Sequence, residues 1–502
     1  MKSIKRIIAL LLTAVMTITM SVTAFAAEPS CSLTVNVKGG QNLKGQTISL
    51  YKLFDLSTSK SGETTNYAYT VSKTTGYKDA LKSALGTSLQ GTTDEDYANA
   101  VLNLAKDNSD AVQKFANDFT ATALKSKLSA TKTSNKITEP KTSFDFNNLT
   151  PGYYLVYVTG GKEIQSSLVT VEKETNTVNL KTEAPSITKT ADKDTVSIGQ
   201  VVKYTVTGSV PDTTGYSEYV YNIHDTLSNG LDFVNDETGT PTSDGNVKVT
   251  VAFKDATDAS TAPTTATIDT DNSKKMSLDL SEWVKASQAN KGKEFTVTYY
   301  AKVNKVADVS TKNNATLEYG NNPGETTTTT PSEAKTPTYP LDIKKFAKTD
   351  NKMLAGAKFK LYKDSVADEN VIKVTGSEGN YVVDPNSKNT VFESVASITG
   401  QNYNLHVNGL AAGTYYLVET EAPAGYNKLT ASIKVVIAKD GDNWTISKDG
   451  TPETDKIIDV ENSTGSILPS TGGMGTIAFT VVAAILVLGV AVSFIRDRKR
   501  EN

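Results

Sequence analysis

The chain has 502 residues, more than one hydrophobic core usually organises, so its length predicts two to four domains. Its net charge of −3, with both signs interspersed, provides neither the basic stripe of a nucleic-acid-binding protein nor an acidic tail. A single cysteine, Cys31, excludes a framework of internal disulfides.

The sequence offers little for catalysis or metal binding. Its two histidines, His224 and His406, lie far apart, and no metal-ligand spacing, nucleophile elbow or phosphate loop stands out. We therefore expect a protein that is not an enzyme and that has no cofactor and no metal site.

The first 26 residues predict a secretory signal peptide. Lys2, Lys5 and Arg6 form a charged start, an apolar run follows from Ile7, and Ala24-Phe25-Ala26 is a small-x-small cleavage site. The mature chain is therefore expected to be exported.

The first module, residues 28–181, combines strands with a helical insertion. Apolar residues at helical spacing predict helices between residues 94 and 126, and they are Ala98, Val101, Leu102, Ala105, Val112, Phe115, Ala116 and Phe119. The rest of the module favours β-strands.

Two further modules, residues 182–335 and 336–463, show the alternation of half-buried strands. Examples are Val202/Tyr204/Val206, Phe295/Val297/Tyr299 and the hairpin from Ile433 through Asp440-Gly441 to Ile446. A threonine- and proline-rich stretch from Gly324 to Pro340 predicts the linker between them. We expect a mainly β protein built from tandem β-sandwiches.

The first and third modules share an internal repeat. Leu50-Tyr51-Lys52 matches Leu361-Tyr362-Lys363, and residues 153–157 (YYLVY) match residues 415–419 (YYLVE). The two modules are therefore expected to share a fold, with Tyr157 standing opposite Glu419.

The C-terminal region, residues 464–502, resembles the cell-wall sorting signal of Gram-positive surface proteins. It contains Leu468-Pro469-Ser470-Thr471-Gly472, an apolar run from Ile477 to Ile495 and a basic tail from Arg496 to Arg500. About nineteen residues at roughly 1.5 Å each span a bilayer core as a helix. The resemblance implies that a sortase cleaves between Thr471 and Gly472 and passes the threonine to an amine.

Residues 416–426 (YLVETEAPAGY) resemble the E-box of CnaB-type immunoglobulin-like domains. In that family a buried glutamate promotes an isopeptide bond between a lysine of the first strand and an asparagine of the last. The matching residues are Glu419, Lys345 and Asn462. Lys344 and Lys348 lie close by, but Lys345 shares strand parity with Ile343, so both are expected to face the core.

The second module resembles CnaA-like domains, in which an aspartate is the acid. The resemblance implies Lys189, Asp225 and Asn314 as the bonding set, with Asn313 as the competitor of Asn314. In the first module a tyrosine replaces the E-box glutamate, and the expected first strand from Leu33 to Val37 has no lysine. We expect no isopeptide bond there.

The order of these parts resembles the major pilins of Gram-positive bacteria. The resemblance implies a shaft subunit that a pilin sortase joins through Thr471 to a lysine of the next copy, and that a housekeeping sortase finally attaches to peptidoglycan. Minor pilins would be further partners. The Tyr-Pro-Lys motif of such pilins is absent, and Lys181 is the preferred linking lysine, above Lys344. A monomeric wall-anchored adhesin or a minor pilin is the alternative.

Overall fold

The computed structural model describes residues 30–37, 42–61, 64–107, 109–159, 166–180, 184–213, 216–255, 261–320 and 324–465. The predicted signal peptide, Lys181 and the sorting signal lie outside these residues. In the part of the chain that is described, no helix is both long and apolar enough to cross a bilayer. The chain forms two compact units, one of residues up to 194 with 200–337, the other of residues 195–199 with 338 onward.

The first unit contains two pairs of sheets. The pair nearest the N-terminus is a sandwich whose smaller sheet has the order β5-β1-β8, with β1 (Cys31–Val37) parallel to β8 (Thr175–Leu180) and antiparallel to β5 (Ser143–Leu149). The larger sheet consists of β3 (Thr64–Val71), β2 (Ile48–Ser61), β6 (Gly152–Val158) and β7 (Ser167–Val171), with β4 (Lys132–Thr133) paired to β2.

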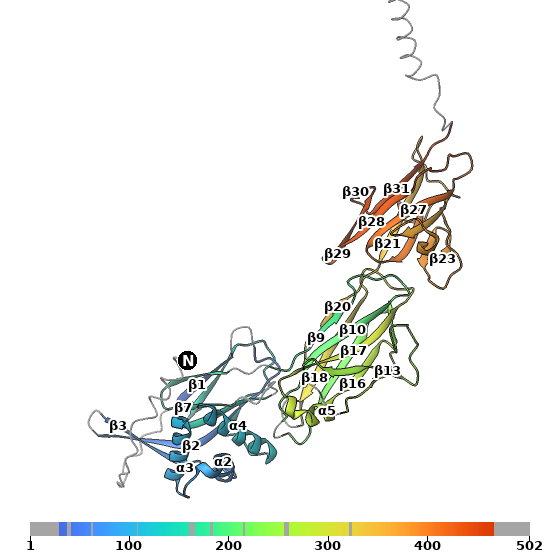
Figure 1. The fold of residues 1–502 in the computed structure, drawn as a ribbon. Coiled ribbons are helices and arrows are strands. Elements are labelled where there is room, and N and C mark those ends of the chain that lie inside the picture. Colours follow the sequence, from blue (N-terminus) through green and yellow to red (C-terminus); the bar gives the residue numbers. More distant parts are fainter. Residues whose placement is uncertain are drawn as a thin grey trace, which may run out of the picture. The chain divides into compact units, whose positions relative to one another are not determined.

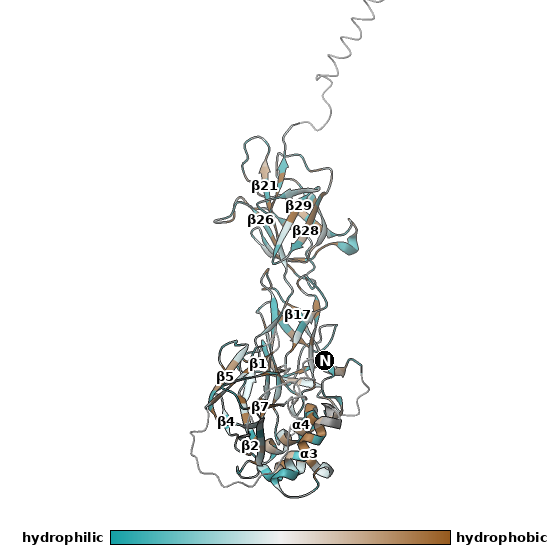
Figure 2. Ribbon diagram, turned by 90° about the vertical axis from the view of Figure 1, so that its left-hand side faces the viewer, coloured by the Kyte–Doolittle hydropathy of each residue, from teal (hydrophilic) through white to brown (hydrophobic). Residues whose placement is uncertain are grey.

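Helices cover the outer face of the larger sheet (Figure 1). They are α2 (Tyr77–Leu85), the short η1 (Gly86–Ser88), α3 (Asp94–Asp107) and α4 (Ser109–Lys125). Hydrophobic residues of α3 and α4 are visible in Figure 2, and Phe115 and Phe119 pack in one cluster with Leu155 of β6. The helical insertion predicted for residues 94–126 is confirmed.

The helix α2 was not predicted. Its buried residues Tyr77, Ala80, Leu81 and Leu85 do follow helical spacing, but the helix has only nine residues. It begins after Gly76, whose φ of 83° is a backbone conformation that favours glycine. Four buried residues in so short a helix give only a weak periodic signal, so the sequence pattern did not predict it.

The second pair of sheets in the first unit forms the next sandwich. One sheet has the order β12-β17-β10-β9, with β14 also on β17, and the other has the order β13-β15-β16-β11-β18-β19, with β20 also on β18. The bounds are β9 (Thr188–Ala191), β10 (Val201–Ser209), β11 (Tyr221–Leu227), β12 (Leu231–Val234), β13 (Asn246–Lys248), β14 (Thr250–Phe253), β15 (Thr265–Ile268), β16 (Lys275–Asp279), α5 (Ser281–Ala286), η2 (Gln288–Asn290), β17 (Glu294–Val303), β18 (Lys312–Gly320), β19 (Thr326–Thr328) and β20 (Ser332–Lys335).

Part of the predicted linker is therefore strand. Both β19 and β20 lie between Gly324 and Pro340 and pair antiparallel with β18. Threonine is β-branched and favours strands. Part of the threonine run that resembled a low-complexity linker therefore forms β19, a short strand that pairs with β18.

The second unit is a sandwich in which the first and last strands are neighbours. Here β21 (Tyr339–Ala347) runs parallel to β31 (Ile457–Asn462) and antiparallel to β26 (Leu405–Leu410). The predicted hairpin from Ile433 to Ile446 is present. The remaining elements are β22 (Lys358–Lys363), η3 (Asp368–Asn370), β23 (Val374–Ser377), β24 (Asn380–Val383), β25 (Phe392–Glu393), β27 (Gly413–Glu421), β28 (Ile433–Asp440), β29 (Asn443–Lys448) and β30 (Thr451–Glu453).

The repeat between the first and third modules recurs in the topology, but in a different register from the sequence match. Tyr154 donates its hydroxyl hydrogen to the carbonyl of Thr150 at 2.8 Å, just as Tyr415 donates to Ala411 at 2.8 Å. Tyr154, not Tyr153, is therefore the counterpart of Tyr415.

This shift moves the counterpart of Glu419 from Tyr157 to Val158. Val158 pairs with Ile48 in the same way that Glu419 pairs with Phe359. Tyr157 instead points to the helix-covered face, because neighbouring residues of a strand face opposite sides. The sequence match was therefore displaced by one residue, because it aligned the tyrosine pairs that precede the hydrophobic run in both modules.

Candidate cross-linking sites

In the third module, three strands bring Lys345, Glu419 and Asn462 together inside the sandwich. Lys345 and Asn462 come from the parallel neighbours β21 and β31, while Glu419 reaches across from β27 of the facing sheet. The three residues are 0%, 2% and 1% exposed. A lysine and a glutamate are almost never buried this deeply without a partner, so the cluster is a specific arrangement.

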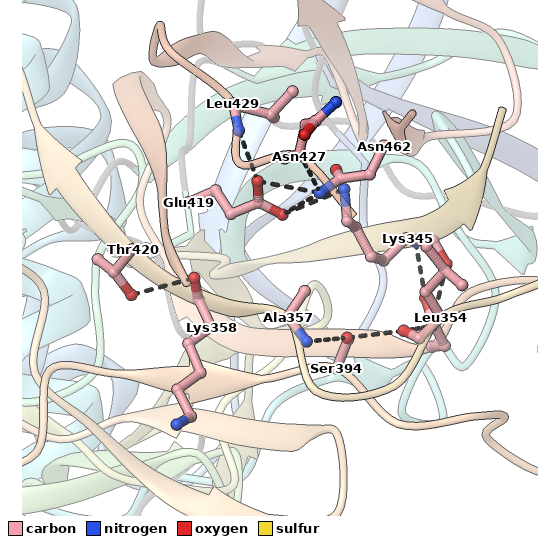
Figure 3. Close-up of polar contacts among 11 residues, drawn as sticks. Lys345, Leu354, Ala357, Lys358, Ser394, Glu419, Thr420, Asn427, Leu429 and Asn462 are labelled. Carbon is pink, nitrogen blue, oxygen red and sulfur yellow. Dashed lines mark hydrogen bonds and ion pairs between the residues drawn. The ribbon is translucent and has the colours of Figure 1, made fainter. Parts of the chain in front are cut away.

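The carboxyl of Glu419 faces the ends of both other side chains (Figure 3). Its Oε1 is 3.2 Å from Lys345 Nζ, and Asn462 Nδ2 donates to Oε1 at 3.1 Å and to Oε2 at 3.2 Å. The backbone N–H of Leu429 donates to Oε2 at 2.8 Å, and Asn462 Nδ2 also contacts the carbonyl of Asn427 at 2.9 Å. These backbone contacts fix both the carboxyl and the carboxamide.

Burial dominates the electrostatics of this site. It lowers the pKa of Lys345, because a charged ammonium loses its hydration, while the nearby Glu419 opposes the shift. A lysine whose neutral form is favoured is a competent nucleophile.

The neighbouring lysines do not reach this site. Lys344 is half-buried on the other face of β21, with Nζ 5.0 Å from the ring centre of Phe346, and Lys348 is exposed and pairs with Glu461 at 2.9 Å. Of the three candidates, the structure brings only Lys345 to Glu419 and Asn462.

The second module holds a comparable cluster between its two sheets. Lys189 of β9 and Tyr299 of β17 belong to one sheet, and Asp225 of β11 and Asn313 of β18 belong to the other. Lys189 Nζ contacts Asp225 Oδ2 directly, and the side chains of Lys189 and Asp225 are both 0% exposed. Burial lowers the pKa of Lys189 and raises the pKa of Asp225, and each partner partly opposes the shift of the other.

The register of β18 replaces Asn314 by Asn313 in this cluster. Asn313 is fully buried and pairs with Leu227, so it shares the core face with Asp225, two residues away along β11. Asn314 pairs with Thr226 on the opposite face. The preference for Asn314 is corrected for this reason: successive residues of a strand alternate between faces, and only Asn313 has the inward parity.

Sequence reasoning missed Tyr299. Its hydroxyl contacts Lys189 Nζ and Asp225 Oδ2, and Asn313 Nδ2 donates to it at 3.3 Å. The available signal was the alternation of β17, which places Phe295, Val297, Tyr299, Ala301 and Val303 inward. A tyrosine in such a series needs a buried partner for its hydroxyl.

The first module has apolar residues at the positions that correspond to Lys345 and Glu419. Leu149 pairs with Cys31 in the first module, as Leu410 pairs with Tyr339 in the third, so Cys31 corresponds to Tyr339. Six residues further along each strand, Val37 occupies the place of Lys345. Val158 occupies the place of Glu419, as described above. The position that corresponds to Asn462 is residue 182, which lies outside the described residues.

Both clusters have the parts of an amide-forming site. A buried acid lies next to a lysine amine and an asparagine carboxamide, and the carboxamide oxygens of Asn313 and Asn462 have no hydrogen-bond partner among the described residues. A protonated acid could donate to such an oxygen and make the carbonyl carbon more electrophilic. Among the described residues no group of three or more His, Cys, Asp and Glu side chains gathers in a way that could hold a metal ion.

Comparison with known proteins identifies two segments of the chain. Residues 340–452 match the SpaA family, described as a prealbumin-like fold domain, and residues 461–502 match the LPXTG cell wall anchor motif. The chain thus carries a prealbumin-like domain followed by a cell wall anchor, and it is a cell-wall-anchored surface protein.

Several solved structures are similar to the chain at low identity. The T6 backbone pilin of Streptococcus pyogenes is 16% identical, covers 88% of this chain and 100% of its own, and has a TM-score of 0.45. The major pilin SpaA of Corynebacterium diphtheriae is 17% identical over 86% of this chain and 100% of its own, with a TM-score of 0.45. BcpA, the major pilin subunit of Bacillus cereus, is 14% identical; the match covers 87% of this chain and 99% of BcpA, with a TM-score of 0.36. No curated protein sequence matches the chain.

Proposed function

We propose that this chain is the structural shaft subunit of a covalent cell-surface pilus and that its sandwiches are locked by intramolecular isopeptide bonds. The observation that carries the proposal is the pair of buried lysine–acid–asparagine clusters in a chain that ends in a cell wall anchor. The bonds are Lys345–Asn462, promoted by Glu419, and Lys189–Asn313, promoted by Asp225. Their formation is a single maturation event for each bond.

The reaction joins the neutral lysine amine to the asparagine carbonyl carbon. The acid polarises the carbonyl and moves protons, the new amide forms, and ammonia leaves. Deep burial supports this chemistry because water, which would compete and would stabilise the charged amine, is excluded from both sites.

The position of the third-module bond suits a protein under tension. Lys345 lies near the end of β21, Asn462 is the last residue of β31, and the two strands are parallel. Force that enters along β21 would therefore pass through the bond and leave after Asn462. The intervening 116 residues, from 346 to 461, would carry none of it.

Assembly would use the sorting signal and a lysine of the next copy. A pilin sortase would cleave after Thr471 and transfer its acyl group to Lys181, and a housekeeping sortase would attach the finished polymer to peptidoglycan. A head-to-tail contact that does not close on itself produces a filament.

Denaturing gels of cell wall extracts from producing cells test this proposal. We expect a boiling-resistant ladder in the wild type that collapses to monomer in the Lys181→Ala variant, with Lys344→Ala as the matched control that keeps the ladder. A ladder that survives Lys181→Ala would reject this lysine but keep the shaft subunit. A single wild-type band, in cells shown to express the sortase, would contradict the proposal and favour the monomeric adhesin.

A further inference from the structure

The second-module site contains a group that has no counterpart in the third module. The phenol of Tyr299 contacts the amine, the acid and the carboxamide at once, through Lys189 Nζ, Asp225 Oδ2 and Asn313 Nδ2. Among the described residues of the third module, Glu419 is the one side chain that contacts both Lys345 and Asn462. We propose that Tyr299 is a catalytic residue of the second-module cross-link and that its hydroxyl relays a proton between Asp225 and the leaving nitrogen of Asn313. This inference rests on the proposed isopeptide function.

The contacts of the shorter acid favour a relay through Tyr299, even though Asn313 lies close enough to Asp225 to lower the pKa of its carboxyl. Aspartate is one methylene shorter than glutamate. Asp225 Oδ2 is occupied by Lys189 and Tyr299, whereas Asp225 Oδ1 has no hydrogen-bond partner among the described residues. Asn313 Nδ2 reaches the tyrosine hydroxyl at 3.3 Å. A hydroxyl both donates and accepts, so it can give one proton while it receives another.

The proton and bond changes balance without a co-reactant. Lys189 Nζ bonds to Cγ of Asn313, and the Cγ–Nδ2 bond breaks. Nζ loses one proton to Asp225, Tyr299 gives its hydroxyl proton to Nδ2, and Asp225 restores the proton of Tyr299. The net transfer is one proton from Nζ to Nδ2, which leaves as ammonia, and both Asp225 and Tyr299 return to their starting states.

The hydroxyl is suited to this role because it stays protonated. Burial, followed by the proximity of Asp225, raises the pKa of Tyr299 well above its usual value. The group therefore holds its proton until the leaving nitrogen becomes basic in the tetrahedral intermediate.

A second tyrosine provides a matched control. Tyr204 and Tyr299 both face Lys189, with Nζ 4.9 Å and 4.8 Å from their ring centres, and the rings stack at 6.0 Å. The hydroxyl of Tyr204, however, forms a hydrogen bond with Thr336 at 3.0 Å, and in the described part of the chain it forms none with the amine or the acid. Replacing each tyrosine by phenylalanine keeps both rings, so comparing the two variants separates the effect of the Tyr299 hydroxyl from the effect of ring packing.

The test follows cross-linking of the mature chain made by cell-free synthesis, quenched at intervals and analysed by mass and by peptide mapping. In Tyr299→Phe we expect the Lys189–Asn313 link to form about a hundredfold more slowly or not at all, within the range for one general acid–base group. The Lys345–Asn462 link should form at the wild-type rate in the same molecules. Tyr204→Phe should form both links at the wild-type rate.

The possible outcomes separate the inference from the function on which it rests. A Lys189–Asn313 link that forms at the wild-type rate in Tyr299→Phe would overturn the relay but leave the isopeptide function intact. If the wild-type chain lacked this link, the proposed second-module bond itself would be rejected.

Should Tyr299→Phe misfold, synthesis with 3-fluorotyrosine keeps the hydroxyl but makes it more acidic. The relay predicts a shifted pH profile for the second-module link and an unchanged one for the third-module link. Two unchanged profiles would contradict it.

Discussion

Lys345 Nζ lies 3.2 Å from Glu419 Oε1, and neither side chain has any exposed surface. Burial lowers the pKa of Lys345, because a charged ammonium loses its hydration there, while the nearby Glu419 opposes this shift. This pair is therefore better suited to chemistry than to stabilisation as an ion pair.

Glu419→Gln keeps the shape of this side chain but removes its acid function. We expect the variant to lack the Lys345–Asn462 bond and to keep the Lys189–Asn313 bond, because the second site has its own acid. Intact mass should be higher than that of the wild type by about one ammonia, and peptide mapping should locate the missing link. The exposed Glu421→Gln is the control, and a complete bond in Glu419→Gln would contradict the assigned role.

Asn313 and Asn314 offer a direct comparison of two adjacent residues. Asn313→Ala should abolish the second-module bond, since only Asn313 faces Asp225, whereas Asn314→Ala should keep it. Mass spectrometry of the denatured proteins distinguishes the two. The reverse pattern would mean that β18 has the other register.

The third-module bond should make a large contribution to stability. It closes a loop of 462 − 345 = 117 residue steps, and the chain-entropy relation used for disulfides gives about 5 kcal/mol for such a loop. Asn462→Ala should lower the free energy of unfolding of this module by that order, whereas Lys344→Ala should change it little. Denaturant unfolding of the mature chain, followed by a probe in the third module, measures the difference.

Bond formation should depend on pH through the lysines. Burial lowers the pKa of Lys345, and the amine attacks only when neutral. Cross-linking should thus be fast above the lowered pKa and slow down as the pH falls through it, because the fraction of neutral amine decreases. Cell-free chain quenched at intervals across a pH series reports this rate, and a rate that rises with acidity would exclude the neutral-amine mechanism.

The covalent loops should limit how far the protein extends under force. In Asn462→Ala, unfolding of the third module should release the roughly 400 Å that 117 residues span when extended, and the wild type should not release this length. Single-molecule stretching of the mature chain measures the difference.

In the second module the proposed loop closes at Asn313, so residues 314–337, with β19, β20 and most of β18, lie outside it. We expect this segment to yield before the looped part does.

The sequence was sufficient to predict the lysine–glutamate–asparagine cluster of the third module. The extended motif around Glu419 and the parity of Lys345 with Ile343 identified three residues that the structure brings together. The helices from residue 94 and the hairpin at Asp440 were also predictable, because their periodicity is strong.

The sequence could not settle features that depend on register. The choice between Asn313 and Asn314 requires the pairing of β18 with β11, and the true counterpart of Glu419 requires the pairing of β6 with β2. A shift of one residue reverses every side chain of a strand, and local sequence carries little information about such shifts. Tyr299 was missed because its hydroxyl meets side chains of three other strands, β9, β11 and β18, and only the fold brings these together.

The intact mass of the denatured mature protein shows whether the chain is cross-linked within itself. We predict a mass below that of the unmodified chain by two molecules of ammonia, with one link mapped to Lys189–Asn313 and the other to Lys345–Asn462. An unmodified mass would mean that both buried clusters are unreacted and that the proposed cross-links do not form.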